Sequence, residues 1–421
     1  MVFYNFKNHI ISGYLFYLIP LGLVSGPFLP DLFLTVIGIS FLIKCIIDRN
    51  FNPFKITLSK YFFLFYVTLL SSSVISNFPL FSLESSFFYI RYLLYFVAIY
   101  YLCSKNPSII NNFLNILLIT VIIVVFDGYF EFFFNHNILG SSSPDPSRIL
   151  SFFHAMIIGS FLSKILPLIF LYLTFKELNK TKIILIYYFI CLIYVLIFLS
   201  GERSAFLHAS IIFIFLSITI SHLRKLFFIS STLILILLSM VMITNDTIKD
   251  RMFTSVIDGF NIKSQNINLT DDQKIIFFSP AHDRYIRVAY QIFLDNKLLG
   301  SGPNTFRKEC SYYSEKLFNN TSGCNTHPHN TYAQLLAETG VIGFSLLISL
   351  FFYIVILLFK NLKAKNLDDH YRYSKICLLT YFFIILFPLT PTGNFFNNWI
   401  GAIYFLPVGI YLSSLVNYEK K

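Results

Sequence analysis

Charged residues are scarce in this sequence, and their scarcity limits the class of protein. Only 13% of the 421 residues are Asp, Glu, Lys or Arg, whereas 56% are hydrophobic. A chain of this composition cannot find enough polar surface to cover a water-soluble globule. The composition therefore excludes a soluble domain and indicates a membrane protein.

Several motifs that would point to other functions are also missing. There is no CxxC pair of the kind that binds zinc. The glycine-bearing stretch Leu299–Phe306 lacks both the lysine and the preceding strand of a nucleotide-binding loop, so it is interpreted as a tight turn that ends a helix. The chain also shows no internal repeat and no inverted-repeat symmetry, which many transporters have.

Long apolar runs are abundant instead, and twelve are long enough to cross a membrane as helices, which takes about 18 residues or more. The first has no small-residue cleavage site and leads directly into a second run, so we expect a retained span rather than a signal peptide. The twelve runs are roughly 10–25, 28–47, 60–77, 86–103, 110–128, 155–175, 182–199, 205–220, 226–244, 340–359, 374–390 and 397–416.

The distribution of lysine and arginine predicts the orientation. If both termini are cytoplasmic and the spans alternate, most cations fall in cytoplasmic segments, while the short outer loops keep little beyond Arg148 and Arg203. The net charge of +11 then reflects this bias and contact with anionic lipid, and does not suggest nucleic acid binding. The predicted cytoplasmic cations are Lys44, Arg49, Lys55, Lys60, Lys176, Lys180, Lys182, Arg224, Lys225, Lys360, Lys363, Lys365, Arg372, Lys375, Lys420 and Lys421.

The predicted fold is an all-α polytopic membrane protein with one soluble insertion. Residues 1–244 hold spans one to nine, 245–338 form a polar outer domain, and 339–421 hold the last three spans and a cytoplasmic tail. We expect the insertion to be a small, mostly helical periplasmic domain with loops around Asn261–Asp272 and Cys310–Thr326.

Two of the six cysteines, Cys310 and Cys324, fall in this outer domain. The bacterial periplasm oxidises thiols, so the sequence predicts a disulfide between them; two free thiols are the alternative. The other four lie in or beside spans, where a buried small apolar side chain is the expected role. They are Cys45, Cys103, Cys191 and Cys377.

The segment 326–343 is predicted to be a loop that turns into a helix, with Pro328 in the first helical turn. His329 would lie at the start of this helix, and an imidazole with a pKa near neutral can take a proton from a hydroxyl. Glu338 is nine residues on and does not share the face of His329, so it would not orient that ring. The alternative is an ordinary surface histidine beside a helix end.

Four arginines are predicted on the outer side, where the short loops otherwise hold few cations. They could bind a dianionic group at the outer leaflet, because guanidinium matches phosphate oxygens in a bidentate manner. The alternative for each is an exposed arginine that fixes the end of a span. The four are Arg148, Arg203, Arg284 and Arg287, the last two in a probable helix over 283–295.

Two further cations, Arg91 and Lys164, lie within predicted spans and should face the interior of the bundle or a wet cavity. Asp127 and Glu131, at the outer end of the fifth span, are possible partners of Lys164.

Taken together, these residues resemble the O-antigen ligase and O-antigen polymerase superfamily of bacterial envelopes. The resemblance covers roughly 199–345 and is supported by the twelve spans and the late outer loop. One departure is Lys297, where many members have proline before the Gly-x-Gly turn. The motifs that carry the resemblance are Arg203-x3-Leu207, the Gly300-x-Gly302 turn after a helix, and His329-Asn330-x9-Gly340-x2-Gly343.

The resemblance implies a metal-independent membrane glycosyltransferase of the GT-C type that needs no cofactor. Its donor would be a glycan on undecaprenyl diphosphate in the outer leaflet, and its acceptor a sugar hydroxyl of the lipid A core. Arg203 would contact the diphosphate and His329 would activate the acceptor, both at the periplasmic face of the inner membrane. The weaker candidates for substrate binding are Arg148, Arg284, Arg287 and Asn330.

Other functions stay open at this point. A ligase is favoured because the two motifs occur together, but a polymerase of the same superfamily would use the same donor with the end sugar of another lipid-linked repeat unit as acceptor. A polysaccharide transporter or flippase would instead place paired charges at the membrane midplane. A scaffold of envelope assembly would need neither Arg203 nor His329.

Overall fold

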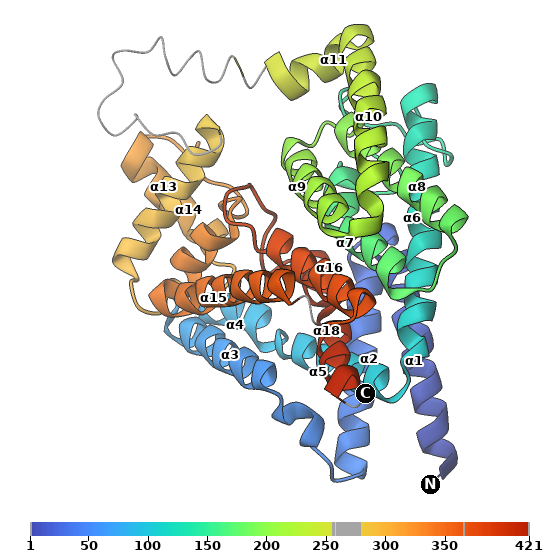
Figure 1. Ribbon diagram of the computed structural model, residues 1–421. Coiled ribbons are helices and arrows are strands. Elements are labelled where there is room, and N and C mark those ends of the chain that lie inside the picture. Colours follow the sequence, from blue (N-terminus) through green and yellow to red (C-terminus); the bar gives the residue numbers. More distant parts are fainter. Residues whose placement is uncertain (1, 255–256, 258–278, 365–366, 420–421) are drawn as a thin grey trace.

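A computed structural model describes residues 2–254, 257, 279–364 and 367–419, and within these ranges the regular elements are helices (Figure 1). The elements are α1 Val2–Ser25, α2 Phe28–Ile47, η1 Asn52–Lys55, α3 Thr57–Ile75, α4 Pro79–Phe87, α5 Ile90–Lys105, α6 Ser108–Phe134, α7 Ile158–Phe175, α8 Lys180–Leu199, α9 Arg203–Thr219, η2 Ser221–Leu223, α10 Arg224–Thr244, α11 Asp246–Lys249, η3 Asp250–Thr254, α13 Pro280–Asp295, α14 Phe306–Phe318, α15 Thr331–Lys363, α16 Asp369–Ile385, α17 Asn398–Phe405 and α18 Val408–Glu419.

Eight helical segments are long and apolar enough to cross a membrane, and two shorter apolar helices, Ser12–Ser25 and Arg203–Thr219, accompany them. The prediction of an all-helical polytopic protein is therefore confirmed within the described residues, while the count of twelve spans and their orientation stay predictions. The eight are Phe28–Ile47, Thr57–Ile75, Pro79–Lys105, Ser108–Phe134, Ile158–Phe175, Lys180–Leu199, Ser221–Thr244 and Thr331–Lys363.

Two of the predicted spans are each built from two helices. The run 86–103 falls on α4 and α5, which meet at Phe88 and Tyr89. The run 397–416 falls on α17 and α18, and Pro407 lies at their junction. Proline removes a helical hydrogen bond and clashes with the preceding turn, which accounts for the second break.

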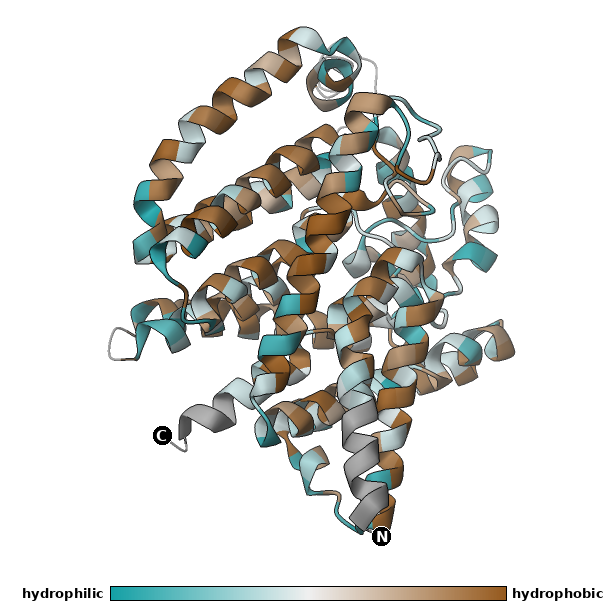
Figure 2. Cartoon of the chain, turned by 90° about the vertical axis from the view of Figure 1, so that its right-hand side faces the viewer, coloured by the Kyte–Doolittle hydropathy of each residue, from teal (hydrophilic) through white to brown (hydrophobic). Residues whose placement is uncertain are grey.

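The helices differ widely in how much of their surface is covered. In α7, 78% of the span window is buried inside the protein, whereas in the segment containing α10 only 11% is buried. Figure 2 shows apolar residues along the lengths of the long helices and polar residues gathered at helix ends and loops. Helix α10 therefore presents its apolar side chains to lipid, and α7 lies at the centre of the bundle.

The charges inside predicted spans find different partners. Arg91 pairs with Asp31 of α2, with 2.8 Å between Nε and Oδ1, and also donates to the Asn398 side chain. Asp127 and Glu131 do not pair with Lys164, so that prediction is wrong. Both carboxylates are buried and accept hydrogen bonds from the loop that follows α6. The donors are the backbone N–H groups of Ile138, Leu150 and Ser151 and the hydroxyl of Ser151.

Helices α13 and α14 and the first half of α15 share a small apolar core of their own. Val288 and Ile292 of α13 pack with Phe306 of α14 and with Ala337 from the first half of α15. The predicted boundary between residues 338 and 339 thus falls inside one helix, next to its break at Gly340. Part of the predicted domain 245–338, including the loop around Asn261–Asp272, lies outside the described residues.

The turn at 297–302 is clamped onto this break in α15. Gly340 has a φ of +61°, and Gly300 has a φ of +72°. Such φ values favour glycine, and a Cβ on either residue would lie 2.3 Å from the opposite backbone. The backbone groups freed by the break therefore pair with the turn. The bonds are Val341 N–H to Lys297 O, Ile342 N–H to Leu298 O, Ser301 N–H to Ala337 O and Gly302 N–H to Glu338 O.

Candidate active site

His329 lies at the centre of a group of rings formed by α13 and the loop before α15. The ring of His327 is 4.1 Å from it between centroids, and those of His282 and Tyr285 on α13 are 5.4 and 5.5 Å away. His329 is half-buried. We call His282, Tyr285, His327 and His329 the histidine cluster.

The backbone around His329 is held by α15 and by residues 386–397, which join α16 to α17. Asn330 is the N-cap of α15: its Oδ1 accepts from the N–H groups of Tyr332 and Ala333, each at 3.0 Å. The prediction that Pro328 forms the first helical turn is therefore wrong, because Pro328 precedes the cap. His329 itself has a φ of +54°, and its carbonyl accepts from the N–H of Thr392 at 2.8 Å.

Asn330 thus has a structural role that the sequence did not indicate. Its Nδ2 donates to the carbonyl oxygens of Pro388 at 2.9 Å and Thr390 at 3.4 Å, and the residue is buried. With both ends of the amide bonded within the protein, Asn330 positions His329 by fixing the loop to the helix start. Contact of Asn330 with a substrate stays a prediction.

The surroundings of His329 keep its imidazole neutral. Burial, followed by the nearby His282, lowers the pKa of His329 to about 4, and burial followed by the neighbouring His329 lowers the pKa of His327 to about 3. The expected near-neutral pKa of His329 is therefore wrong. The amide nitrogen of Asn325 lies 3.2 Å from Nε2 of His329. An amide NH2 only donates, so Nε2 carries the lone pair and Nδ1 the proton.

Arg284 and Arg287 lie on α13, the helix that also supplies His282 and Tyr285. At about 100° per residue, the two arginines point roughly 100–160° around the helix from those rings, so they do not share the face that contacts His329. Arg287 pairs with Asp283 at 2.7 Å. Arg284 has a buried Nε that makes no hydrogen bond among the described residues.

Arg203 belongs to a second group at the N-terminal ends of α7 and α9. Its Nε donates to the carbonyl of Arg251 at 2.8 Å, and Nε of Arg251 donates to the carbonyl of Gly201 at 2.8 Å. Gly201 has a φ of +68°, and a Cβ there would lie 2.7 Å from the Arg251 side chain, so only glycine allows this approach. Arg251 also pairs with Asp145 at 3.0 Å.

Arg148 completes this second group, which we call the arginine group: Arg148, Arg203 and Arg251. One terminal nitrogen of Arg148 donates to the carbonyl of Met156 at 2.6 Å and lies 4.0 Å from Glu202. Its Nε is buried and makes no hydrogen bond among the described residues. Burial lowers the pKa of this guanidinium, which still stays protonated.

The segment 386–397 links the two groups. Thr390 contacts His208 of α9 through its hydroxyl, at 2.9 Å from Nε2, and also accepts from Asn330. Two residues later, Thr392 holds the carbonyl of His329. His208 lies five residues after Arg203 on α9, so this loop contacts the second turn of the helix that carries Arg203 and the residues around His329.

Glu338 is fully buried and serves the fold of the site. Its Oε1 accepts from the N–H of Phe306 at 2.9 Å, at the N-terminus of α14, and its Oε2 accepts from Gln334 at 3.0 Å. A carboxylate at a helix N-terminus satisfies free N–H groups and the helix dipole. As expected from its position, Glu338 does not orient His329.

Other residues of the site were not singled out from the sequence. His282, Tyr285 and His327 surround His329, and Arg307 at the start of α14 lies close enough to His327 to affect it electrostatically. The spacing His282-x2-Tyr285 on one helix face was a usable signal, but nothing in the sequence showed that this face meets residue 329. Among the described residues, no group of three or more His, Cys, Asp or Glu side chains is arranged to hold a metal ion.

The predicted cysteine pair supports the loop before His329. Cys310 of α14 and Cys324 are joined by a disulfide with 4.8 Å between their Cα atoms. The other four cysteines are free and buried, as predicted.

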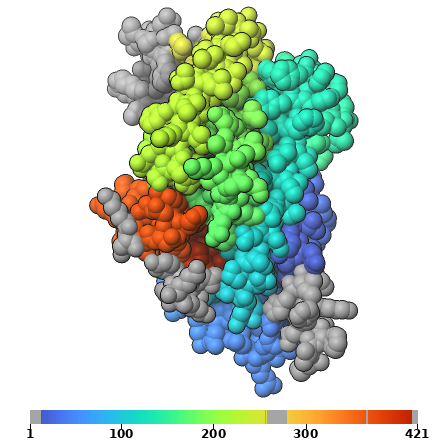
Figure 3. Space-filling view, turned by 45° about the vertical axis from the view of Figure 1, so that its right-hand side comes forward, coloured from blue at the N-terminus to red at the C-terminus, as the bar shows by residue number. Residues whose placement is uncertain are grey.

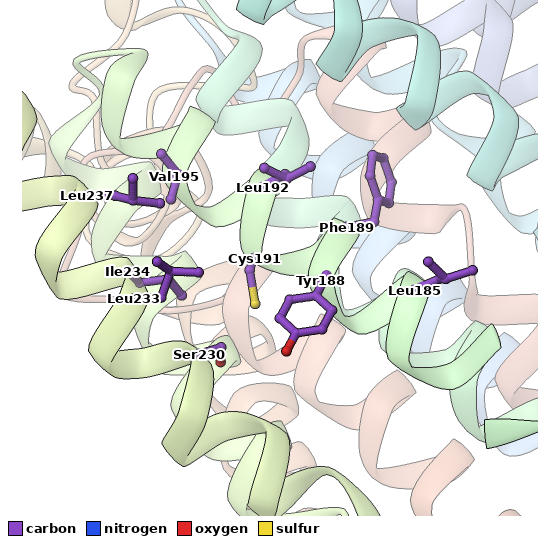
Figure 4. Close-up of a pocket in the computed structure, with 10 residues that line it drawn as sticks. All are labelled: Leu185, Tyr188, Phe189, Cys191, Leu192, Val195, Ser230, Leu233, Ile234 and Leu237. Carbon is purple, nitrogen blue, oxygen red and sulfur yellow. The ribbon is translucent and has the colours of Figure 1, made fainter. Parts of the chain in front are cut away.

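An apolar groove of about 340 Å³ lies between α8 and α10 (Figure 4). In Figure 3 these two helices form part of the outer surface of the protein. The groove has no charged side chain, so it suits hydrocarbon and does not bind an anion. The residues that line it are Leu185, Tyr188, Phe189, Cys191, Leu192, Val195, Ser230, Leu233, Ile234 and Leu237.

Comparison with known families gives one match. Residues 187–348 match the family model described as O-Antigen ligase. None of the curated proteins compared with the chain matches it. The matched region runs from α8 into the second half of α15 and contains Arg203, Arg284, Arg287 and His329, whereas Arg148 precedes it.

Proposed function

We propose that this chain, whose residues 187–348 match the O-Antigen ligase family model, transfers a glycan from undecaprenyl diphosphate to a sugar hydroxyl of the lipid A core. The transfer would take place at the periplasmic face of the bacterial inner membrane, with both termini of the chain in the cytoplasm. The observation that carries the proposal is the half-buried, neutral His329, whose Nε2 presents a lone pair within the histidine cluster.

His329 acts as the general base in this proposal. The acceptor hydroxyl takes the place of Asn325 at Nε2 and gives its proton to that nitrogen while its oxygen attacks the anomeric carbon. The bond from the anomeric carbon to the phosphate oxygen breaks, and undecaprenyl diphosphate leaves with the bonding electrons. One displacement of this kind inverts the configuration of the anomeric carbon.

The donor also strengthens the base. A pKa of about 4 keeps the imidazole unprotonated but makes it a weak proton acceptor. A bound diphosphate brings negative charge near the imidazole, and such charge favours the imidazolium that forms in the transition state. Base strength would therefore rise only when the donor is in place.

In this proposal the arginines bind the leaving group, undecaprenyl diphosphate. Arg203 and Arg148 stabilise charge on the diphosphate, and Arg284, with its unbonded Nε, is a further candidate. The chemistry assigned to these residues requires neither a metal nor a nucleotide, because the diphosphate is already an activated leaving group.

A polymerase is the second candidate, because the family description and the proposed donor, base and leaving group suit both reactions. The two reactions differ in the acceptor, which for a polymerase is the end sugar of another lipid-linked repeat unit. The choice of ligase rests on the joint presence of the Arg203 and His329 motifs.

The test is a glycolipid gel of the source bacterium without this gene, complemented with wild type, His329→Asn or His136→Asn. Asparagine tolerates the positive φ of residue 329 but cannot act as a base. His136 is an exposed histidine of another predicted outer loop and serves as the matched control.

A ligase predicts that the deletion and His329→Asn lose long polysaccharide on the lipid A core while polymer accumulates on the lipid carrier. A polymerase predicts that single repeat units still reach the core. Full rescue by His329→Asn would remove the proposed base, and an unchanged glycolipid pattern in the deletion would favour a transporter of another substrate or a scaffold.

A further inference from the structure

Lys164 is a charged residue inside the most buried of the candidate spans. It is the seventh residue of α7, so its Cα lies about 9 Å along the helix from Ile158. Its neighbours Ser163 and Ile165 are fully buried, whereas Lys164 is half-buried. A charged group at such a depth is costly unless a partner or a wet cavity receives it.

The ammonium group of Lys164 points toward the outer end of the bundle. Its Nζ lies 3.3 Å from the carbonyl oxygen of Ser160, one turn closer to the outside. It is also near enough to Glu202 and His208, at the start of α9, to interact with both electrostatically. Lys164 therefore faces α9 and the arginine group rather than lipid.

No acid neutralises Lys164 at close range. Among the described residues it makes no ion pair, and the nearby Glu202 is already occupied by the N-terminus of α7. The Glu202 carboxylate accepts from the N–H of Gly159 at 2.8 Å and from the N–H and hydroxyl of Ser160 at 3.1 and 2.6 Å. Its cationic neighbours are Arg148, at 4.0 Å, and Lys164 itself.

Two arginines next to Glu202, the acid near Lys164, also have bonding capacity left over: Arg203 follows it in the chain and Arg148 lies 4.0 Å from it. The only hydrogen bond of the Arg203 side chain within the described chain goes to a carbonyl, and Nε of Arg148 is buried without an acceptor. By contrast, Arg91 has Asp31, and Lys176 at the other end of α7 has Asn115 and the ring of Tyr172. Among the described residues, Lys164, Arg203 and Arg148 therefore bring spare cationic bonding capacity to the N-terminal ends of α7 and α9, in addition to Arg284 on α13.

We propose that Lys164 binds the diphosphate of the lipid-linked donor from the membrane side, opposite Arg203. The assignment rests on the proposed function and adds a residue that lies outside the region matched by the family model. A diphosphate would satisfy Lys164, Arg203 and Arg148 together, since lysine binds phosphate as a point charge and arginine through its planar fork.

The position of Lys164 fits the geometry of a lipid carrier. The tail of the donor lies in hydrocarbon and its diphosphate lies at the interface. A side chain that contacts the diphosphate from the hydrocarbon side must therefore come from a residue inside a span. The flexible lysine stem extends toward the interface while its Cα stays in the bundle. Lys164 would hold the diphosphate both before and after the glycan leaves, and thus contribute to donor binding and to release of the carrier.

The experiment measures binding of glycan-free undecaprenyl diphosphate, and of undecaprenol as the uncharged probe, to the purified full chain in lipid nanodiscs. Lys164→Met should weaken binding of undecaprenyl diphosphate about 10- to 100-fold, the range for a lost hydrogen bond between charged groups, and leave undecaprenol binding unchanged. Lys164→Arg should stay close to wild type. Lys176→Met, at the C-cap of the same helix, is the matched control and should also bind normally.

Equal binding of undecaprenyl diphosphate by wild type and Lys164→Met would overturn the inference while leaving the proposed function intact. A wild type that does not prefer the diphosphate over undecaprenol would instead contradict the donor in the proposed function. If Lys164→Met does not fold, reductive methylation of the wild type tests the contact between Lys164 and the diphosphate instead. Undecaprenyl diphosphate should protect Lys164 from methylation and undecaprenol should not, and absence of protection would refute the contact.

Discussion

Gly340 lies at the break in α15 with a φ of +61°, and a Cβ there would lie 2.3 Å from the carbonyl oxygen of Leu298. Alanine at this position must carry a backbone with φ +61° and ψ −165°, a region almost restricted to glycine, which costs about 1–3 kcal/mol. It must also push the 297–302 turn away and disrupt the bonds from Val341 and Ile342 to that turn, at about 1 kcal/mol each. We therefore expect Gly340→Ala to lower the free energy of unfolding by about 3–5 kcal/mol.

Comparison with Gly140→Ala separates the steric clash at residue 340 from the cost of a positive φ. Gly140 also has a positive φ, +82°, but a Cβ there would meet nothing within 4 Å. Its replacement should cost only the backbone strain, about 1–2 kcal/mol. The assay is unfolding of the purified chain in mixed micelles of a mild and a denaturing detergent, followed by circular dichroism.

Gly300→Ala perturbs the same clamp from the other side, because its Cβ would lie 2.3 Å from the backbone of Glu338. The double variant with Gly340→Ala should therefore lose less stability than the sum of the two single changes. If Gly340→Ala costs no more than Gly140→Ala, or if the two clamp variants are additive, the 297–302 turn does not hold α15 as described.

Two further predictions concern the outer domain. The acid limb of kcat/KM should lie near pH 4 and not near 6.5, because the lowered pKa of His329 keeps the base neutral until the pH falls through that value; a pH profile with the limb near 6.5 would contradict the assigned environment. Removal of the Cys310–Cys324 bond by Cys310→Ser with Cys324→Ser should lower stability by about 3 kcal/mol, the value for a closed loop of about 15 residues. Reductant should lower the melting temperature of the wild type but not that of the double variant, and equal sensitivity of both would show that the bond contributes nothing.

The sequence by itself determined the class of protein and where its helices lie. Apolar runs of span length coincide with helices because, in lipid, a backbone satisfies its own hydrogen bonds only as a helix or a closed barrel. The family motifs around Arg203 and His329 could also be recognised from the sequence. The positive φ at residues 300 and 340 favours glycine, so the backbone geometry there corresponds to glycines that the sequence shows directly.

What only the tertiary structure decided is which residues meet. Asp127 and Glu131 bind the loop after α6 instead of Lys164, and Asn330 caps α15, because backbone N–H groups compete with side chains as partners and no sequence spacing reveals that competition. The assembly of His282 and Tyr285 around His329 joins segments more than 40 residues apart. The low pKa of His329 follows from that assembly, since burial and a neighbouring imidazole are properties of the folded chain and not of the residue.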